Sequence, residues 1–197
     1  MVREETATRR DKTLLVVLVL VFALPVLGSW YLVFYTDVMR DRGGTLQHGT
    51  LIEPPRLLEN AALFDPSQNT QASLHGKWTL IAFAPNACDT GCRDNLYRMR
   101  QIRLAVGKKM FRVQRVIVLD EATLMGPGAA VLNDYPGQLI LRSDRAGDWF
   151  LASFVLNGNG PGHALFLVDP NGYLMMHYPP ETDPSGIIRD LELLLKF

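Results

Sequence analysis

The chain contains only two cysteines, Cys88 and Cys92, and they lie four residues apart directly after an apolar run. Side chains at positions i and i+4 share one face of a helix, so both thiols can point at one small target. If the turn between them is loose enough, the two sulfurs can close into a disulfide. As thiolates they can instead hold a soft metal, for which Cu(I) is the best match outside iron–sulfur and zinc sites. A structural zinc site needs about four protein ligands, more than this pair and one histidine supply.

A purely structural role for the pair is the alternative, either as a stable disulfide or as two inert buried thiols. A bridge over so short a loop constrains the unfolded chain little. The free N–H groups and the positive dipole at the start of a helix stabilise a thiolate. Arg93 adds positive charge there, whereas Asp89 and Asp94 oppose it. The position of the pair at a strand-to-helix junction therefore favours a reactive function.

Alternating strand and helix patterns position this pair. The apolar run of residues 78–85 predicts a buried strand, and the helical spacing over 89–109 predicts the helix that carries Cys92. A turn signal within residues 163–178 predicts a hairpin. Further strands are expected at 112–120 and 137–142, and further helices at 144–156 and 183–197, the last capped at Asp183 or Ser185. This order indicates an α/β, thioredoxin-like fold with a mixed sheet flanked by helices on both faces.

An uncharged apolar stretch over residues 14–35 predicts one transmembrane helix in front of this domain. Its 22 residues match a hydrocarbon core of about 30 Å. More Lys and Arg residues precede the stretch than closely follow it, so the positive-inside rule places residues 1–13 in the cytoplasm. A cleaved signal peptide is the alternative, but no A-x-A cleavage pattern follows the stretch.

The remaining sequence divides into a linker over residues 36–56, punctuated by paired glycines and paired prolines, and a soluble domain over 57–197. We therefore expect a single-pass protein of the cell inner membrane with its soluble domain in the periplasm, or on the equivalent intermembrane side. The chain has 20 basic and 20 acidic residues. This balance gives no strong field for nucleic acid, which we do not expect as a partner.

Two motifs are similar to those of a known family. FAPNACDTGC over residues 83–92 resembles a strand followed by C-x-x-x-C, and HALFLVDPNGYL over 163–174 resembles a histidine, a strand and a DP-G hairpin. In this order they resemble the Sco/SenC family of membrane-anchored, thioredoxin-like copper chaperones of cytochrome c oxidase assembly. Redox thioredoxins carry C-x-x-C, so the three intervening residues favour the Sco resemblance.

The resemblance implies a function and its site. Cys88 and Cys92 would bind copper as Cu(I), or would reduce the cysteines of a partner's copper site. His163 would be the third copper ligand. The implied partner is cytochrome c oxidase subunit II or another assembly factor, on the outer side of the membrane.

The sequence departs from the family pattern at two places. Asp89 and Arg93 stand where a proline usually follows each cysteine. His163 lies six residues before Asp169, whereas the family's histidine usually lies eight before, a place held here by Pro161. A shift of two residues keeps the same face of a strand, so His163 is still expected to point at the cysteines.

Two other functions remain open. The chain could be a general membrane-anchored thiol–disulfide oxidoreductase, which would not need His163. It could also be a non-catalytic thioredoxin-like scaffold that uses its cysteines only as a bridge. The alternative for His163 itself is a loop histidine that merely precedes a strand.

Overall fold

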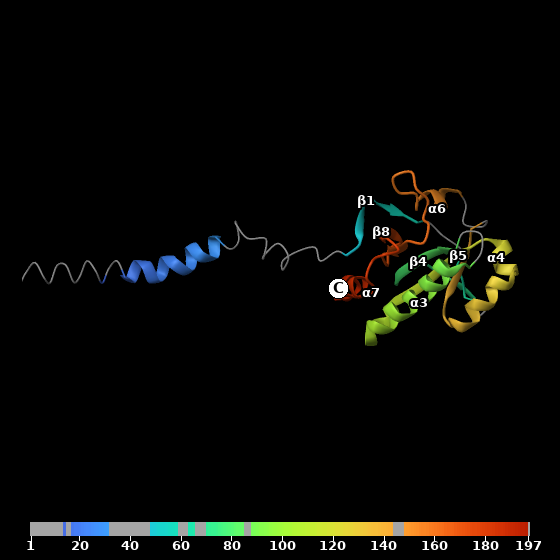
Figure 1. Cartoon of the computed structure of the whole chain (residues 1–197), viewed down its shortest axis with the longest axis horizontal. Coiled ribbons are helices and arrows are strands. Elements are labelled where there is room, and N and C mark those ends of the chain that lie inside the picture. The colour runs from blue at the N-terminus through green and yellow to red at the C-terminus, as the bar shows by residue number, and fades with distance from the viewer. Residues whose placement is uncertain are drawn as a thin grey trace, which may run out of the picture. The chain divides into compact units, whose positions relative to one another are not determined.

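The computed structural model describes residue 14 and residues 17–31, 48–58, 63–65, 70–84, 88–143 and 148–196. The chain divides into two compact units, Met1–Leu46 and Gln47–Phe197 (Figure 1). In the first unit, residues 17–31 are helical. Across the described ranges, no helix combines the length and the apolar character needed to cross a membrane. Residues 15–16 and 32–35 of the predicted span lie outside the described residues, so the transmembrane helix stays a prediction.

The second unit is built around one eight-stranded mixed sheet in the order β1-β8-β7-β4-β5-β6-β2-β3. The two pairs β4–β5 and β5–β6 are parallel, and the other pairs are antiparallel. The strands span Thr50–Leu57 (β1), Leu63–Asp65 (β2), Thr70–Ala72 (β3), Trp78–Ala84 (β4), Val113–Leu119 (β5), Leu139–Arg142 (β6), Leu165–Val168 (β7) and Tyr173–Tyr178 (β8).

The helices cover both faces of this sheet. The α-helices of the second unit are α3 (Thr90–Ala105), α4 (Glu121–Met125), α6 (Asp148–Ala152) and α7 (Pro184–Leu194), and the 3-10 helices are η1 (Gly107–Arg112) and η2 (Pro127–Asp134). Helices α3 and α7 contact each other and pack their apolar side chains on one face. The aromatic side chains of α6 and of the turn after it pack on the other face.

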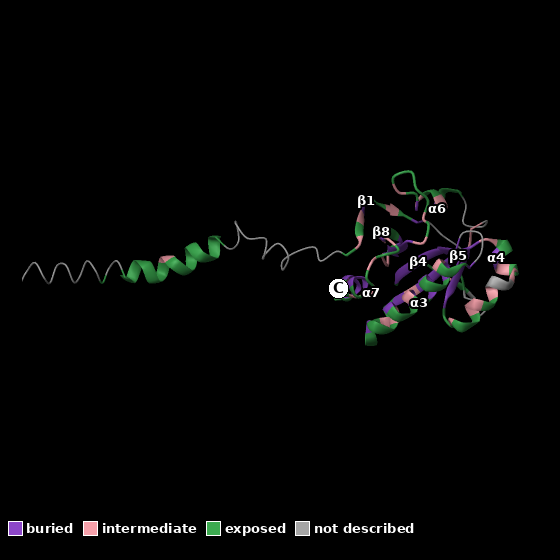
Figure 2. Cartoon of the chain, viewed as in Figure 1, coloured by how far each residue is buried: buried purple, intermediate pink, exposed green. Residues whose placement is uncertain are grey.

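All seven residues of strand β4 are buried, which places β4 at the centre of the core (Figure 2). Its side chains alternate between the two faces. Leu80 and Ala82 join the cluster under α3 and α7, whereas Phe83 packs edge-on against Phe154 and Phe166 in the second cluster. The strand is thus held from both sides, which fixes the point at which the chain leaves the sheet toward Cys88.

Most predicted elements of the domain are confirmed. The predicted strands at 78–85, 112–120 and 137–142 correspond to β4, β5 and β6, and the predicted hairpin corresponds to β7 and β8. The predicted helix over 89–109 corresponds to α3 and η1. The C-terminal helix is capped by Asp183, which accepts a hydrogen bond from the Ser185 amide at 3.1 Å. Hydrogen bonds from Ser185 lower the pKa of Asp183.

Two predictions of extent are wrong. The helix predicted over 144–156 is the short α6, Asp148–Ala152, with residues 144–147 outside the described range. The predicted linker over 36–56 is wrong for its last part, because Thr50–Leu57 forms β1 and pairs with β8. Proline lacks an amide donor and is confined to edge positions in sheets. Pro54 and Pro55 therefore made an edge strand resemble a linker.

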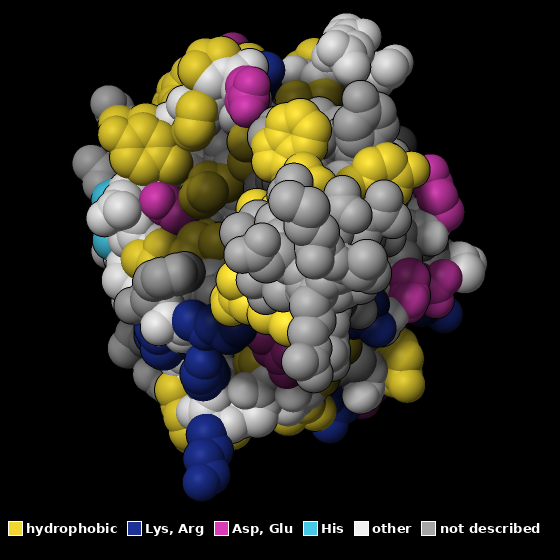
Figure 3. All heavy atoms as spheres, turned by 90° about the vertical axis from the view of Figure 1, so that its left-hand side faces the viewer, with side chains coloured by type: hydrophobic (Ala, Val, Ile, Leu, Met, Phe, Trp, Pro, Cys, Tyr) yellow, Lys and Arg dark blue, Asp and Glu magenta, His cyan; other side chains and the backbone are white. Residues whose placement is uncertain are grey.

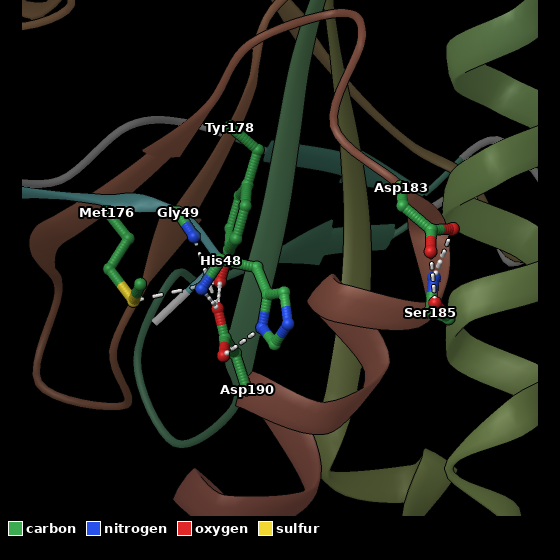
Figure 4. Close-up of polar contacts among 7 residues, drawn as sticks. All are labelled: His48, Gly49, Met176, Tyr178, Asp183, Ser185 and Asp190. Carbon is green, nitrogen blue, oxygen red and sulfur yellow. Dashed lines mark hydrogen bonds and ion pairs between the residues drawn. The ribbon is translucent and has the colours of Figure 1, made fainter. Parts of the chain in front are cut away.

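The start of the second unit is fastened to α7 by one buried carboxylate (Figure 4). Asp190 accepts hydrogen bonds from the backbone amides of His48 at 2.9 Å and Gly49 at 3.3 Å, and from the Tyr178 hydroxyl at 3.2 Å. The His48 Nδ1 atom lies 3.2 Å from the other carboxylate oxygen. Burial, and then the charge of Asp190, raises the pKa of Tyr178. This cluster holds the chain in position where β1 begins.

Candidate redox and metal site

Cys88 and Cys92 form a disulfide, with 5.1 Å between their Cα atoms. Cys88 follows the end of β4, and Cys92 lies in the first turn of α3. Both residues are buried, Cys92 completely and Cys88 with 5% of its surface exposed. In thiol–disulfide exchange a thiolate attacks a sulfur that it can reach. Of the two cysteines, Cys88 is thus the more exposed residue.

Asp89 forms the N-cap of α3 between the two cysteines. Its backbone is extended, and its carboxylate accepts a hydrogen bond from the Cys92 amide at 2.9 Å. Such a cap satisfies one of the free N–H groups at the start of a helix. Asp89 stands where the Sco/SenC pattern usually has a proline. The structure gives it a positive role in fixing the first turn that carries Cys92.

His163 lies next to this first turn. It precedes β7, which pairs antiparallel with β4 so that Phe166 faces Ile81. Continuing this register brings His163 beside the end of β4. Its backbone carbonyl accepts a hydrogen bond from the buried Asn95 side chain of α3 at 2.9 Å. Its Nε2 atom lies 3.4 Å from a carboxylate oxygen of Asp89.

The imidazole of His163 packs directly against Gly91, the residue before Cys92. A Cβ atom added to Gly91 would lie 2.6 Å from Nδ1 of the ring and 2.7 Å from two ring carbons. Only glycine allows this approach without displacement of the ring. The Nδ1 atom is buried and has no hydrogen-bond partner among the described residues. A buried polar atom without a partner is costly, so the hydrogen-bonding capacity of this nitrogen is unused in the oxidised site.

We expect Gly91→Ala to push the His163 ring off α3 while the disulfide remains. Overpacking costs typically about 1–3 kcal/mol, and the better helix propensity of alanine offsets about 1 kcal/mol of this. The free energy of unfolding, measured by denaturant titration, should therefore fall by about 0–2 kcal/mol. A crystal structure of the variant should show the ring displaced.

Gly160→Ala is the matched control for this substitution, because a Cβ atom there would meet nothing within 4 Å. It should leave the ring in place. An unmoved ring in Gly91→Ala would contradict the close contact.

The other three histidines lie away from the cysteines. His48 contacts Asp190, His75 lies near Gly172 in a turn, and His177 stands on β8. Within the described residues, no group of three His, Cys, Asp or Glu side chains is arranged to hold a metal ion. A disulfide offers no thiolate, so a donor set of two sulfurs and the His163 imidazole requires reduction of the bridge first. After reduction, these donor types suit Cu(I).

A cavity of about 510 Å³ opens beside the loop that leads to His163. It lies at the carboxyl ends of β4 and β5, and Val155 and the short loop Gly160, Pro161 and Gly162 contribute to its wall. The remaining lining is mainly apolar, from β4, β5 and α6. The cavity thus borders Gly162, the residue that precedes His163.

Comparisons with known proteins agree with this architecture. A family model described as "Transmembrane-like, thioredoxin-like, C-terminal domain" matches residues 78–197. A comparison with curated protein sequences finds no match.

Among solved structures, the copper-bound ScoI of Bradyrhizobium japonicum is 20% identical with a TM-score of 0.54, over 70% of this chain and 99% of that one. Apo Sco1 of Thermus thermophilus is 19% identical with a TM-score of 0.55, over 75% of this chain and 96% of that one. A thiol:disulfide interchange protein from Bacteroides sp. is 19% identical with a TM-score of 0.52, over 73% and 90%. The likeness to Sco proteins predicted from the motifs is thus confirmed in the fold.

Proposed function

Because this chain belongs to the family of transmembrane-like, thioredoxin-like C-terminal domains, we propose that it is a Sco-like, dithiol-dependent copper-handling protein. One observation carries the proposal, which is the imidazole of His163 packed on Gly91 between the two cysteines. A general thioredoxin-like exchange site needs two sulfurs and no imidazole. Two sulfurs with an adjacent imidazole supply the donor types that Cu(I) prefers.

The proposed cycle begins with the disulfide. A partner dithiol reduces the Cys88–Cys92 bridge in two exchange steps and is itself oxidised to a disulfide, and its two thiol protons end on the two cysteines. The reduced pair then binds Cu(I) as cargo and releases protons as the thiols become thiolates. His163 adds a neutral nitrogen to this donor set.

We also infer the setting of this activity from the sequence. The predicted anchor over residues 14–35 would hold the domain on the outer side of the inner membrane. The resemblance to Sco proteins makes cytochrome c oxidase subunit II, or another assembly factor of that enzyme, the proposed recipient of copper or of reducing equivalents. The copper bound by ScoI of Bradyrhizobium japonicum supports the choice of metal.

The test is a titration of the reduced soluble unit, residues 44–197, with Cu(I) against a competing chelator without oxygen. We expect one tight equivalent in the wild type. His163→Ala should weaken binding by roughly tenfold or more while the two sulfurs still hold the metal, since even outer-shell partners change metal affinity by about 10–100-fold.

His75→Ala is the matched control, because it removes an exposed imidazole away from the cysteines. It should bind Cu(I) as the wild type does. Equal affinity in His163→Ala and His75→Ala would remove His163 from the proposed site.

A general thiol–disulfide oxidoreductase is the second candidate, favoured by the disulfide itself. It predicts exchange with unrelated disulfide substrates that is unaffected by His163→Ala. Wild-type reduction of such a substrate, without a tight Cu(I) equivalent, would support this candidate over the first.

A further inference from the structure

The stretch from Asn95 to Leu119 is strongly basic. It contains seven Lys and Arg residues and no Asp or Glu, although the whole chain has a formal net charge of zero. The stretch covers most of α3, all of η1 and all of β5. Strand β5 is mostly buried, so the exposed Lys and Arg side chains of the stretch lie mainly on α3 and η1.

Four of these seven residues, Arg103, Lys108, Lys109 and Arg112, lie in the last turn of α3 or in η1. Lys109 and Arg112 both donate to the backbone carbonyl of Leu195, just after α7, at 3.3 and 2.9 Å. Lys108 is exposed beside them, and these three side chains form no ion pair with any described residue. We call the surface made by Arg103, Lys108, Lys109, Arg112 and Lys196 the basic end. Figure 3 shows Lys and Arg side chains in the lower part of the face that it views.

Large apolar side chains are exposed at the basic end. Phe111, between Lys109 and Arg112 in the sequence, is 69% exposed, and Leu104 in the last turn of α3 is 48% exposed. A protruding aromatic ring among Lys and Arg side chains is typical of surfaces that bind a bilayer interface.

The basic end also lies near the point where the chain enters the domain. His48 contacts Asp190 in α7, and the basic end contacts Leu195 just after α7. Asp190 and Leu195 are five residues apart, which corresponds to about 7.5 Å of helix rise. Residues 36–47, which join the predicted anchor to His48, span at most about 40 Å. A tether of this length would hold the domain, and with it the basic end, at high effective concentration near the bilayer.

We propose that the basic end binds the anionic phospholipid surface of the membrane that anchors the chain. Lys108, Lys109 and Arg112 contact headgroup phosphates, and Phe111 inserts at the interface. Along α3, Cys92 in the first turn lies about 20 Å from Ala105 at this end of the helix. Docking by the basic end would thus direct the disulfide away from the bilayer, toward a partner's exposed domain.

The experiment measures binding of residues 44–197 to vesicles by co-sedimentation. This part has its own core, and solved Sco structures that it covers almost completely consist of the same domain. Vesicles of phosphatidylcholine with about 30% phosphatidylglycerol should bind it, and vesicles of phosphatidylcholine alone should not, since each basic residue near an anionic surface contributes through its charge. Binding should weaken as salt rises.

Lys108→Gln/Lys109→Gln should lower the partition coefficient at least about tenfold. Lys77→Gln/Arg93→Gln removes the same charge from exposed residues elsewhere and should bind as the wild type does. Phe111→Ser keeps every charge and should also weaken binding. An equal loss of vesicle binding in the two double variants would show an effect of net charge alone and would overturn the proposal. No binding to the anionic vesicles at low salt would overturn it too, and would leave an acidic protein surface as the occupant of this end.

Discussion

Replacing Cys88 with serine should abolish tight Cu(I) binding and leave the fold intact. The substitution removes one of two thiolates and exchanges a soft sulfur for a hard oxygen that Cu(I) does not prefer. Loss of an outer-shell partner already lowers metal affinity by about 10–100-fold, so loss of a direct ligand should lower it at least about 100-fold. The measurement is the chelator competition described above, on reduced protein.

The expected stability of this variant follows from the size of the loop that the bridge closes. The disulfide joins residues only four apart, so its removal changes the entropy of the unfolded chain little. We expect the free energy of unfolding to fall by about 2–3 kcal/mol at most, comparable with the change on reducing the wild type. Cys88→Ser in its fully folded form is therefore a fair comparison for metal binding.

Three outcomes separate the three functions. One tight Cu(I) equivalent that is lost in Cys88→Ser supports the copper-handling function. No tight Cu(I) in the wild type, together with exchange activity that disappears in Cys88→Ser, supports a thiol–disulfide oxidoreductase. A double Cys88→Ser/Cys92→Ser variant that retains full function in the cell would support a scaffold and contradict both other proposals.

The elements that sequence patterns predicted are those with a strong local signal. Strand β4 is a continuous apolar run, and α7 follows a clear helical period behind the capping residue Asp183. Strands β2 and β3 have only three residues each, too few for a period to be visible. The edge strand β1 pairs through an irregular register with β8 alone, and its two prolines obscure it.

The same distinction holds for the site. The spacing of Cys88 and Cys92 predicted a pair that can join, because both residues lie on one short stretch. The contact between His163 and Gly91 depends on the pairing of β4 with β7, which are distant in the sequence. No local pattern carries that register. The role of Asp89 as an N-cap has a local signal, since an aspartate directly before a helical period is a typical N-cap. The family pattern, which has a proline at this position, does not predict that role.

The second large effect is expected at Asp190, far from the cysteines. Asp190 is 97% buried and accepts from two backbone amides and the Tyr178 hydroxyl, with His48 Nδ1 beside it (Figure 4). Asp190→Asn keeps the shape and leaves one oxygen for these three donors, but it removes the charge and places an NH₂ group opposite His48 Nδ1. Hydrogen bonds to a charged acceptor contribute about 1.5–3 kcal/mol each, more than those to a neutral one. We expect the free energy of unfolding to fall by about 2–4 kcal/mol in denaturant titration.

Asp183→Asn is the matched control, because it makes the same substitution at an exposed cap of α7. Asparagine caps a helix about as well as aspartate, so we expect a change below about 0.5 kcal/mol. The loss in the free energy of unfolding for Tyr178→Phe should lie between those of the two asparagine variants. This substitution removes one donor and leaves the backbone amides of His48 and Gly49 satisfied. If Asp190→Asn were no more destabilising than Asp183→Asn, the carboxylate would not be what fastens β1 to α7. If the expected order holds, the buried carboxylate of Asp190 fixes the start of the domain, His48 and Gly49, on α7.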